Sequence, residues 1–195
     1  MHDPYTDLSE LIEDCWRMLF RPTQDKNSTL RTPAVVTVGM NEKPQARTVV
    51  LRKVDKERRL LRFYSDFRAE KISDLQRNPE LLWLFYDRKH QIQLRVRSQT
   101  EIHHQDELCR QIWDNTPVPQ RKNYCTQVPP ATPATEATNG LADDWQENTE
   151  AHFSNFTVID STAFSIDFLF LHPDLQHRAR FDWQDERWSG MWIVP

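Results

Sequence analysis

The first part of the chain alternates apolar and polar residues with the period of an α-helix. Leu8, Leu11, Cys15 and Leu19 recur at steps of three or four residues, so they share one helix face. Asp7 precedes them and belongs to the residue types that cap helix N-termini. The pattern predicts an amphipathic helix over about residues 7–20.

Most of the remaining chain has the alternation and β-branched content of strands, with polar turns between the runs. Strands are predicted at 33–39, 46–54, 60–64, 81–87 and 91–101, a strand pair at 156–170, and a closing hairpin formed by 178–183 and 188–194. Two short helices are predicted at 66–79 and 106–113. Strands thus outweigh short helices, which predicts a mainly β fold, an antiparallel barrel with peripheral helices at its rim.

The length of 195 residues fits a single domain spanning 1–195. Within it, the segment from Val128 onward reads VPPATPATEATN, which is rich in Pro, Ala and Thr and cannot bury a packed face. We therefore expect a flexible surface loop over about residues 128–148.

Charge and composition exclude several classes of function. The net charge is −4, so no overall positive field would attract the chain to nucleic acid or to an anionic membrane. The start of the chain lacks a signal-peptide pattern, and no apolar run approaches the roughly 18 residues that a membrane span needs. These features predict a cytoplasmic protein. Cys15, Cys109 and Cys125 are too widely spaced for a zinc or disulfide pattern, which predicts reduced, buried thiols.

Common catalytic and nucleotide motifs are missing from the sequence. It contains no GxGxxG, GxxxxGK[ST], HExxH or GxSxG segment. His103 and His104 are adjacent, but neighbouring residues of a strand point to opposite faces, so they do not form a metal pair. No metal site and no catalytic side chain are therefore assigned.

Positive charges concentrate in two neighbouring segments. Arg47 and Arg52 flank a β-branched run, and Arg68 and Lys71 are expected one turn apart near the start of the helix that follows Tyr64 and Ser65. Helix N-termini disfavour cations unless an anion binds there. The charge pattern alone leaves two interpretations open, an anion site and a solvated basic surface.

The order of three segments indicates a family. ARTVVLRK, FYSDFRAEK with LQRNPE, and HQIQLRV resemble the pyridoxamine 5′-phosphate oxidase superfamily of FMN-binding split barrels, where similar segments read R-x-V-L-L-K, Y-T-N and Q-V-R. The likeness covers about residues 30–102 and resumes in WSGMWIVP at the end of the chain. The chain is most similar to the shorter, oxidase-like branch. The resemblance implies an FMN-binding split barrel with an antiparallel, Greek-key-like topology.

The resemblance also implies FMN as the cofactor and assigns residues to it. Those that match the family's flavin and phosphate positions are Arg47, Val49, Val50, Leu51, Arg52, Tyr64, Ser65, Lys71 and Gln93. Lys71 falls on the phosphate lysine, and Gln93 on a glutamine that reaches the flavin of the dimer partner. Arg68 is a displaced candidate, because the oxidase proper carries its arginine directly before the lysine, where this chain has Glu70.

Two functions from different classes follow from this resemblance. The first is an FMN-dependent oxidoreductase that acts on a small, unidentified substrate, in a homodimer whose FMN sites lie at the interface. Redox chemistry then belongs to the flavin, so a catalytic triad is not needed. The alternative is a flavin-binding or haem-binding split-barrel module without turnover, since a fold does not determine a function.

Overall fold

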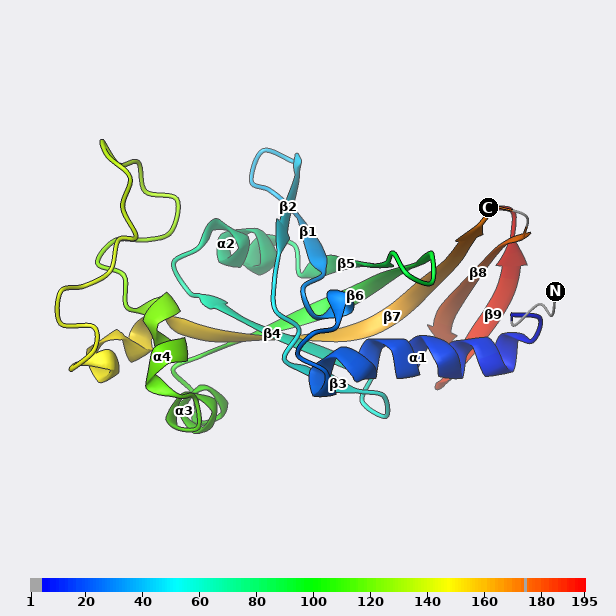
Figure 1. Ribbon diagram of the computed structural model, residues 1–195, viewed down its shortest axis with the longest axis horizontal. Coiled ribbons are helices and arrows are strands. Elements are labelled where there is room, and N and C mark those ends of the chain that lie inside the picture. Colours follow the sequence, from blue (N-terminus) through cyan, green and yellow to red (C-terminus); the bar gives the residue numbers. More distant parts are fainter. Residues whose placement is uncertain (1–4, 174) are drawn as a thin grey trace.

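Nine antiparallel strands form one sheet in the computed structural model, which describes residues 5–173 and 175–195 (Figure 1). The strands are β1 Ala34–Val38, β2 Pro44–Thr48, β3 Lys53–Asp55, β4 Leu60–Asp66, β5 Glu80–Asp87, β6 Ile92–His104, β7 Phe156–His172, β8 Leu175–Gln184 and β9 Arg187–Ile193. The main path runs β2-β1-β5-β6-β7-β4-β3, and the hairpin of β8 and β9 branches from β7.

Strand β7 is the long element on which the sheet divides. One edge of β7 pairs with β6, while the other edge is shared by β4 along residues 156–162 and by β8 along residues 165–172. The prediction of a strand pair at 156–170 is therefore wrong. The polar residues Asp160 and Ser161 do not interrupt the strand, because Asp160 pairs with Arg62 across the ladder, and the Ser161 hydroxyl donates to the Leu61 carbonyl at 3.0 Å.

The predicted strand at 46–54 is interrupted, and the interruption closes the barrel. The Val49 and Leu51 amides donate to the carbonyls of Pro33 and Arg31 at 3.0 and 2.9 Å, whereas the Arg52 amide donates to the Arg62 carbonyl at 2.8 Å. Residues 49–52 thus cross from the edge of β1 to the edge of β4 and join the two ends of the sheet. The fold is mainly β, an antiparallel split barrel with peripheral helices, as predicted.

The helices lie at the periphery, in the positions labelled in Figure 1. They are α1 Leu8–Gln24, α2 Glu70–Arg77, α3 Glu107–Asp114 and α4 Val118–Arg121, with short 3-10 turns η1 Thr29–Arg31, η2 Lys122–Tyr124 and η3 Thr149–Asn155. The Asp7 carboxylate caps α1 by accepting from the Ser9 and Glu10 amides at 2.7 and 3.1 Å. α1 continues to Gln24, past the predicted end at residue 20, and includes Pro22 in its last turn.

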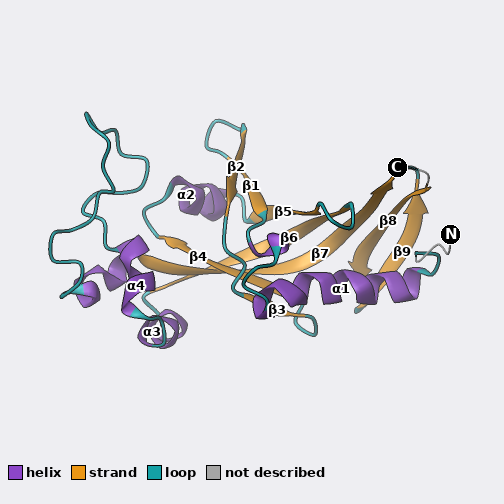
Figure 2. Cartoon of the chain, viewed as in Figure 1, coloured by secondary structure: helices purple, strands orange, loops and turns teal. Residues whose placement is uncertain are grey.

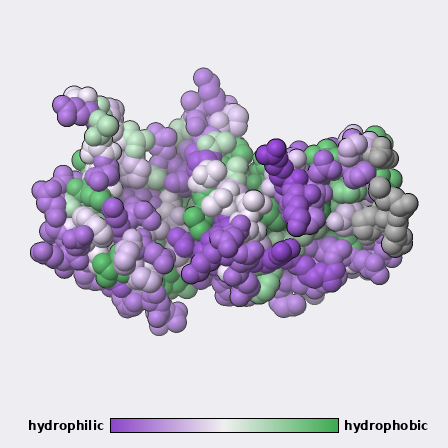
Figure 3. Space-filling view, in the orientation of Figure 1, coloured by the Kyte–Doolittle hydropathy of each residue, from purple (hydrophilic) through white to green (hydrophobic). Residues whose placement is uncertain are grey.

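Helices α1 and α2 cover one face of the sheet, which we call the inner face. A cross-strand row of this face, Val35, Trp83, Val96, Ile166 and Phe181, is at most 1% exposed. Leu11, Cys15, Trp16 and Leu19 of α1 pack into the same core. The exposed side of α1 is hydrophilic (Figure 3), as the helical period predicted.

The opposite, outer face of the sheet carries a different set of side chains. The corresponding outer row consists of Val36, Leu82, Arg97, Ser165 and Asp182. Apolar residues therefore occupy β1 and β5, and charged residues occupy the strands beyond them. Neither α1 nor α2 covers this face, because both pack on the inner side.

A second, smaller core holds α3 and the segments after it at one end of the molecule. It consists of Cys109, Trp113, Tyr124, Phe156 and Val158. Beyond this core, residues 128–148 form a long irregular loop (Figure 2). The flexibility of this loop stays a prediction. In the part of the chain that the structure describes, no helix combines the length and the apolar character needed to cross a membrane.

Candidate functional site

The crossing segment 49–52 forms one wall of an open pocket of about 270 Å³. The pocket is also lined by a residue between η1 and β1, the end of β2, β4, the start of α2 and η2. Its lining residues are Thr32, Thr48, Val49, Val50, Arg52, Tyr64, Lys71, Asn123 and Tyr124. The structure therefore brings together five of the predicted site residues, from segments up to 22 positions apart, in one concave surface.

Lys71 is the central charge of this pocket. It is the second residue of α2, and its ammonium group donates to the Ser65 hydroxyl at 2.9 Å. Burial lowers the pKa of Lys71, the positive charge of Arg47 lowers it further, and Asp66 and Asp74 oppose these effects. None of the ion pairs formed among the described residues includes Lys71. A half-buried cation without a counter-ion indicates a site that can bind an anion.

Arg47 lies next to Lys71 but points to the inner face. Its Nη1 donates to the Thr37 hydroxyl at 2.6 Å and to the Gln45 carbonyl at 2.9 Å, and its Nη2 is 3.8 Å from a carboxylate oxygen of Asp74. Thr37 in turn donates to the same Asp74 oxygen at 2.7 Å. Burial lowers the pKa of Arg47. Arg47 is thus partly neutralised and does not line the pocket.

Arg52 and two tyrosines form the other wall. The Arg52 guanidinium lies 5.2 Å from the centroid of the Tyr64 ring, within the range of a cation–π interaction. Its Nε is buried and has no hydrogen-bond partner among the described residues. Burial raises the pKa of Tyr64, and it raises the pKa of Tyr124 to about 12 although Arg52 opposes both shifts. Both phenols therefore keep their protons at neutral pH.

The structure does not bring Arg68 to this pocket. Its guanidinium binds the Asp66 carboxylate through Nε and Nη2 at 3.0 and 2.7 Å, and Nη2 also donates to the Thr126 hydroxyl at 2.7 Å. α2 begins at Glu70, so the prediction that Arg68 and Lys71 lie one turn apart on a helix is wrong. The physical reason is that Asp66 accepts the Arg68 amide at 2.8 Å, which forms a turn ahead of the helix.

Three further predicted residues lie around the pocket rather than in its lining. Leu51 is fully buried in the main core. Ser65 lies behind Lys71 and donates to the Asp66 carbonyl at 3.2 Å. Gln93 is on the outer face of β6, opposite Tyr86 and Leu169, and does not line the pocket of its own chain.

Sequence reasoning missed Thr32, Thr48, Asn123 and Tyr124. The last two come from the stretch between α3 and the irregular loop, where no hydrophobic period announces an element. A signal existed in the aromatic residues there: Tyr124 packs edge-on against Phe156 with ring centroids 4.9 Å apart, and Trp113 joins them. Aromatic side chains bury a large apolar area, so Trp113 and Tyr124 in this stretch indicate a packed segment rather than a free loop.

Comparisons with known proteins agree with this arrangement. Residues 13–104 match the protein family described as pyridoxamine 5′-phosphate oxidase, FMN-binding domain. Among solved structures, the chain is similar to a pyridoxamine 5′-phosphate oxidase-related, FMN-binding protein of Nostoc punctiforme PCC 73102, with 20% identity, 100% of each chain covered and a TM-score of 0.73. A search of curated proteins finds no match.

Two further solved structures share the fold. PhzG of Burkholderia lata 383, in complex with tetrahydrophenazine-1-carboxylic acid, has 14% identity and a TM-score of 0.68, with 99% of this chain and 95% of that chain covered. A general stress protein 26-related protein of Clostridium acetobutylicum has 14% identity and a TM-score of 0.52, with 96% and 97% covered. Residues 13–104 thus match the FMN-binding domain family of pyridoxamine 5′-phosphate oxidase in sequence, and the chain shares the split-barrel fold of these solved structures over its whole length.

Proposed function

We propose that this protein binds FMN in the pocket beside Lys71 and works as an FMN-dependent oxidoreductase on a small substrate. The observation that carries the proposal is the uncompensated ammonium group of Lys71, held by the Ser65 hydroxyl at 2.9 Å at the base of the pocket. A phosphate gains charge-assisted hydrogen bonds from such a group. The family description names an FMN-binding domain, and the Nostoc relative is described as FMN binding.

The donor set of the pocket fits the cofactor. The buried Nε of Arg52 has no acceptor among the described residues, and the Lys71 ammonium group has one, the Ser65 hydroxyl, so donors remain for the phosphate and ring acceptors of FMN. Val49 and Val50 supply an apolar wall for a flat ring. Of the common axial ligands of haem iron, His, Cys and Met are missing from the lining, and Tyr is present as Tyr64 and Tyr124. Burial raises the pKa of both tyrosines, which disfavours the phenolate form that a tyrosine ligand of iron needs. The pocket therefore favours flavin over haem.

Each side chain then has a physical task. Bound FMN would supply hydride and electron transfer. Lys71 and Ser65 bind and orient the phosphate, and the extended segment at 49–52 supports the ring. Tyr64 and Tyr124 keep their protons, because burial raises their pKa values, and they can donate hydrogen bonds while shielding the pocket from water. We assign no acid–base residue to the substrate reaction.

The proposal includes a homodimer, and the outer face of the sheet supports it. Leu82 and Leu84 are only half-buried there, and Tyr86 and Val38 are 48% and 37% exposed. Large exposed apolar residues that cluster on one face indicate an interaction surface. The pocket of about 270 Å³ is also at the lower limit of small-molecule sites, about 300 Å³, so a second chain would complete it.

Gln93 is the residue through which the partner would act. It lies on the same outer face, between Tyr86 and Leu169, and points away from the core of its own chain. A side chain on that face would contact a second copy that docks there. We propose that Gln93 of each protomer contacts the flavin bound by the other.

The first experiment is to identify the cofactor. FMN-loaded protein should release a molecule with the mass of FMN on denaturation, and an oxidised-flavin spectrum should bleach when a small reductant is added. Sedimentation of the loaded protein should give a dimer. Purified protein that neither retains nor takes up FMN at micromolar concentration would overturn the proposal. A flavin that binds but is never reduced by any donor supports the non-catalytic module instead.

A further inference from the structure

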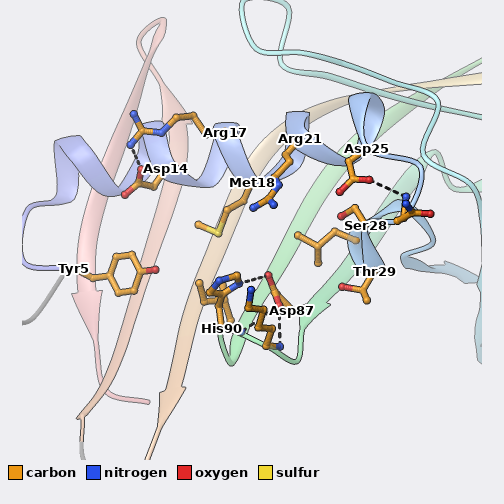
Figure 4. A pocket seen from close by; sticks show the side chains of 14 residues that line it. Tyr5, Asp14, Arg17, Met18, Arg21, Asp25, Ser28, Thr29, Asp87 and His90 are labelled. Atoms are coloured by element: carbon orange, nitrogen blue, oxygen red, sulfur yellow. Dashed lines mark hydrogen bonds and ion pairs between the residues drawn. The ribbon is translucent and has the colours of Figure 1, made fainter.

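A second cavity, of about 490 Å³, lies between α1 and the turn that joins β5 to β6 (Figure 4). It shares no lining residue with the pocket beside Lys71. Its volume falls within the range of about 300–1,000 Å³ that is typical of small-molecule sites. The cavity is thus a separate candidate site on the side of the sheet that carries α1.

One side of this cavity is apolar. Leu30 and Ile92 form its base and are 7% and 4% exposed. Met18 extends from α1 into the cavity, and the Tyr5 ring also lines it, packing edge-on against Phe168 with centroids 4.9 Å apart. Thioether and aromatic groups of this kind favour contact with a flat aromatic ring.

The carboxylates at the rim already have partners. Asp14 pairs with Arg17 on the exposed side of α1. Asp87 accepts from the His90 ring at 2.7 Å and from the Lys89 amide at 2.9 Å. The third lining carboxylate, Asp25, accepts from the Asn27 amide at 2.9 Å and forms no ion pair with a described residue. Each of the three carboxylates thus has a hydrogen-bond donor from its own neighbourhood.

Two cationic side chains at the rim have no such partner among the described residues. Arg21 and Lys89 line the cavity, and neither forms an ion pair with any described residue. Figure 4 shows the Arg21 side chain reaching from α1 into the space above Asp87 and His90. A guanidinium presents two parallel N–H donors, which match a carboxylate. An unpaired arginine beside an apolar base therefore fits a ligand with one anionic end.

We propose that this cavity binds a small aromatic carboxylate. The carboxylate pairs with Arg21, with Lys89 nearby, and the ring packs between Met18 and Ile92. This site is separate from the proposed flavin pocket, and the inference does not rest on flavin binding.

The methionine methyl groups allow a direct test. The sequence contains four methionines, and of these Met18 lines the cavity, whereas Met40 and Met191 are exposed elsewhere. Protein labelled with 13C at the methionine methyls is titrated with naphthalene-2-carboxylate after saturation with FMN. We expect the Met18 signal, assigned with Met18→Leu, to shift in a saturable way while the Met40 and Met191 signals stay in place.

Two variants and an uncharged analogue of the ligand test whether binding depends on the charges of Arg21 and of the carboxylate. Arg21→Gln should weaken binding by about tenfold or more, the size expected for one charge-assisted contact. Arg88→Gln removes the same charge from the adjacent turn, where Arg88 is exposed and outside the cavity, and should change the affinity less than twofold. Naphthalene-2-carboxamide, which has the same ring without the charge, should bind at least tenfold more weakly than the carboxylate.

Three results would overturn the proposal. The first is the absence of any saturable Met18 shift up to millimolar ligand. The second is equal affinity of the wild-type and Arg21→Gln proteins. The third is a shift of the flavin absorption bands with no change at Met18, which would assign the ligand to the flavin pocket. Protein that takes up no FMN leaves the titration itself unaffected, so failure of the proposed function is distinguishable from failure of this site.

Discussion

The ammonium group of Lys71 donates a hydrogen bond of 2.9 Å to the hydroxyl of Ser65, at the base of a pocket lined by the crossing segment between β2 and β3. Burial and the nearby Arg47 charge lower the pKa of this lysine, so the charged form of Lys71 is destabilised in the ligand-free fold. Such strain is typical of functional sites, where stability is given up for binding.

Replacing Lys71 should weaken FMN binding. Lys71→Met removes one charge-assisted contact to a buried phosphate, which corresponds to about 1.5–3 kcal/mol, or about 10- to 100-fold in affinity. Flavin fluorescence titration measures the change. Lys43→Met, an exposed lysine in the turn between β1 and β2, is the matched control and should bind FMN normally. Equal affinities for Lys71→Met and Lys43→Met would argue against the phosphate position.

The same lysine predicts a pH dependence of stability. Its pKa is lower in the folded state than in the unfolded chain, so in the window between the two values the unfolded state binds more protons. The FMN-free protein should therefore gain stability from this group as pH rises through that window toward about 10.4, the ordinary lysine value. Below the window the penalty is fully present.

Urea denaturation of the FMN-free wild type and of Lys71→Met, compared across pH, tests this sign. We expect Lys71→Met to be the more stable protein at neutral pH, with the difference shrinking as pH rises. FMN affinity of the wild type should fall over the same window, as the ammonium group loses its proton. A difference in stability that is constant with pH would mean that Lys71 experiences no burial penalty.

The outer face predicts the position of the dimer interface. Leu84 lies on this face between Ala34 and Arg95. Leu84→Glu should convert the dimer to a monomer at micromolar concentration and weaken FMN binding, because a buried unpaired carboxylate is unfavourable in an apolar interface. Sedimentation velocity measures the first effect. Gln76→Glu adds the same charge on the exposed side of α2 and should leave the dimer intact. A stable Leu84→Glu dimer would rule out this face.

The buried ion pair of Arg62 and Asp160 should be sensitive to loss of one partner. The two side chains meet in two hydrogen bonds of 2.5 and 2.7 Å, and both residues are less than 10% exposed. Asp160→Asn should lower the free energy of unfolding by about 3–5 kcal/mol, since it leaves a buried charge uncompensated. Arg62→Met combined with Asp160→Leu should recover most of this loss in urea denaturation. A single variant within about 1 kcal/mol of wild type would show that water compensates the charge.

Gly190 should not tolerate a side chain. A Cβ atom there would lie 2.6 Å from Cε1 of Phe181, a ring that is 1% exposed beneath α1. Gly190→Ala should therefore destabilise the protein by about 1–3 kcal/mol through overpacking. Combining it with Phe181→Leu should reduce the additional effect of the alanine, and Ser189→Ala on the exposed neighbouring position serves as the control. Thermal denaturation that is unchanged in Gly190→Ala would mean that α1 moves away freely.

The sequence by itself determined much of this protein. The helical period of Leu8, Leu11, Cys15 and Leu19 predicts α1, because an amphipathic helix is a local pattern that needs only one apolar partner surface. The strand periods predict a mainly β barrel. The resemblance of the basic segments to a known family implies a split barrel and marks Arg52, Tyr64 and Lys71, which the structure then brings to one pocket.

Only the tertiary structure decided how those segments meet. Residues 49–52 leave the ladder of β1 and β2 because the chain changes its hydrogen-bond partners there, from residues beside β1 to β4. This change depends on hydrogen bonds to residues outside the local segment. Arg68 is held by Asp66 and Thr126, and Tyr124 reaches the pocket through a core formed with Phe156. The contacts of Arg68 with Thr126 and of Tyr124 with Phe156 join positions separated by tens of residues, and a local hydrophobic period carries no information about them.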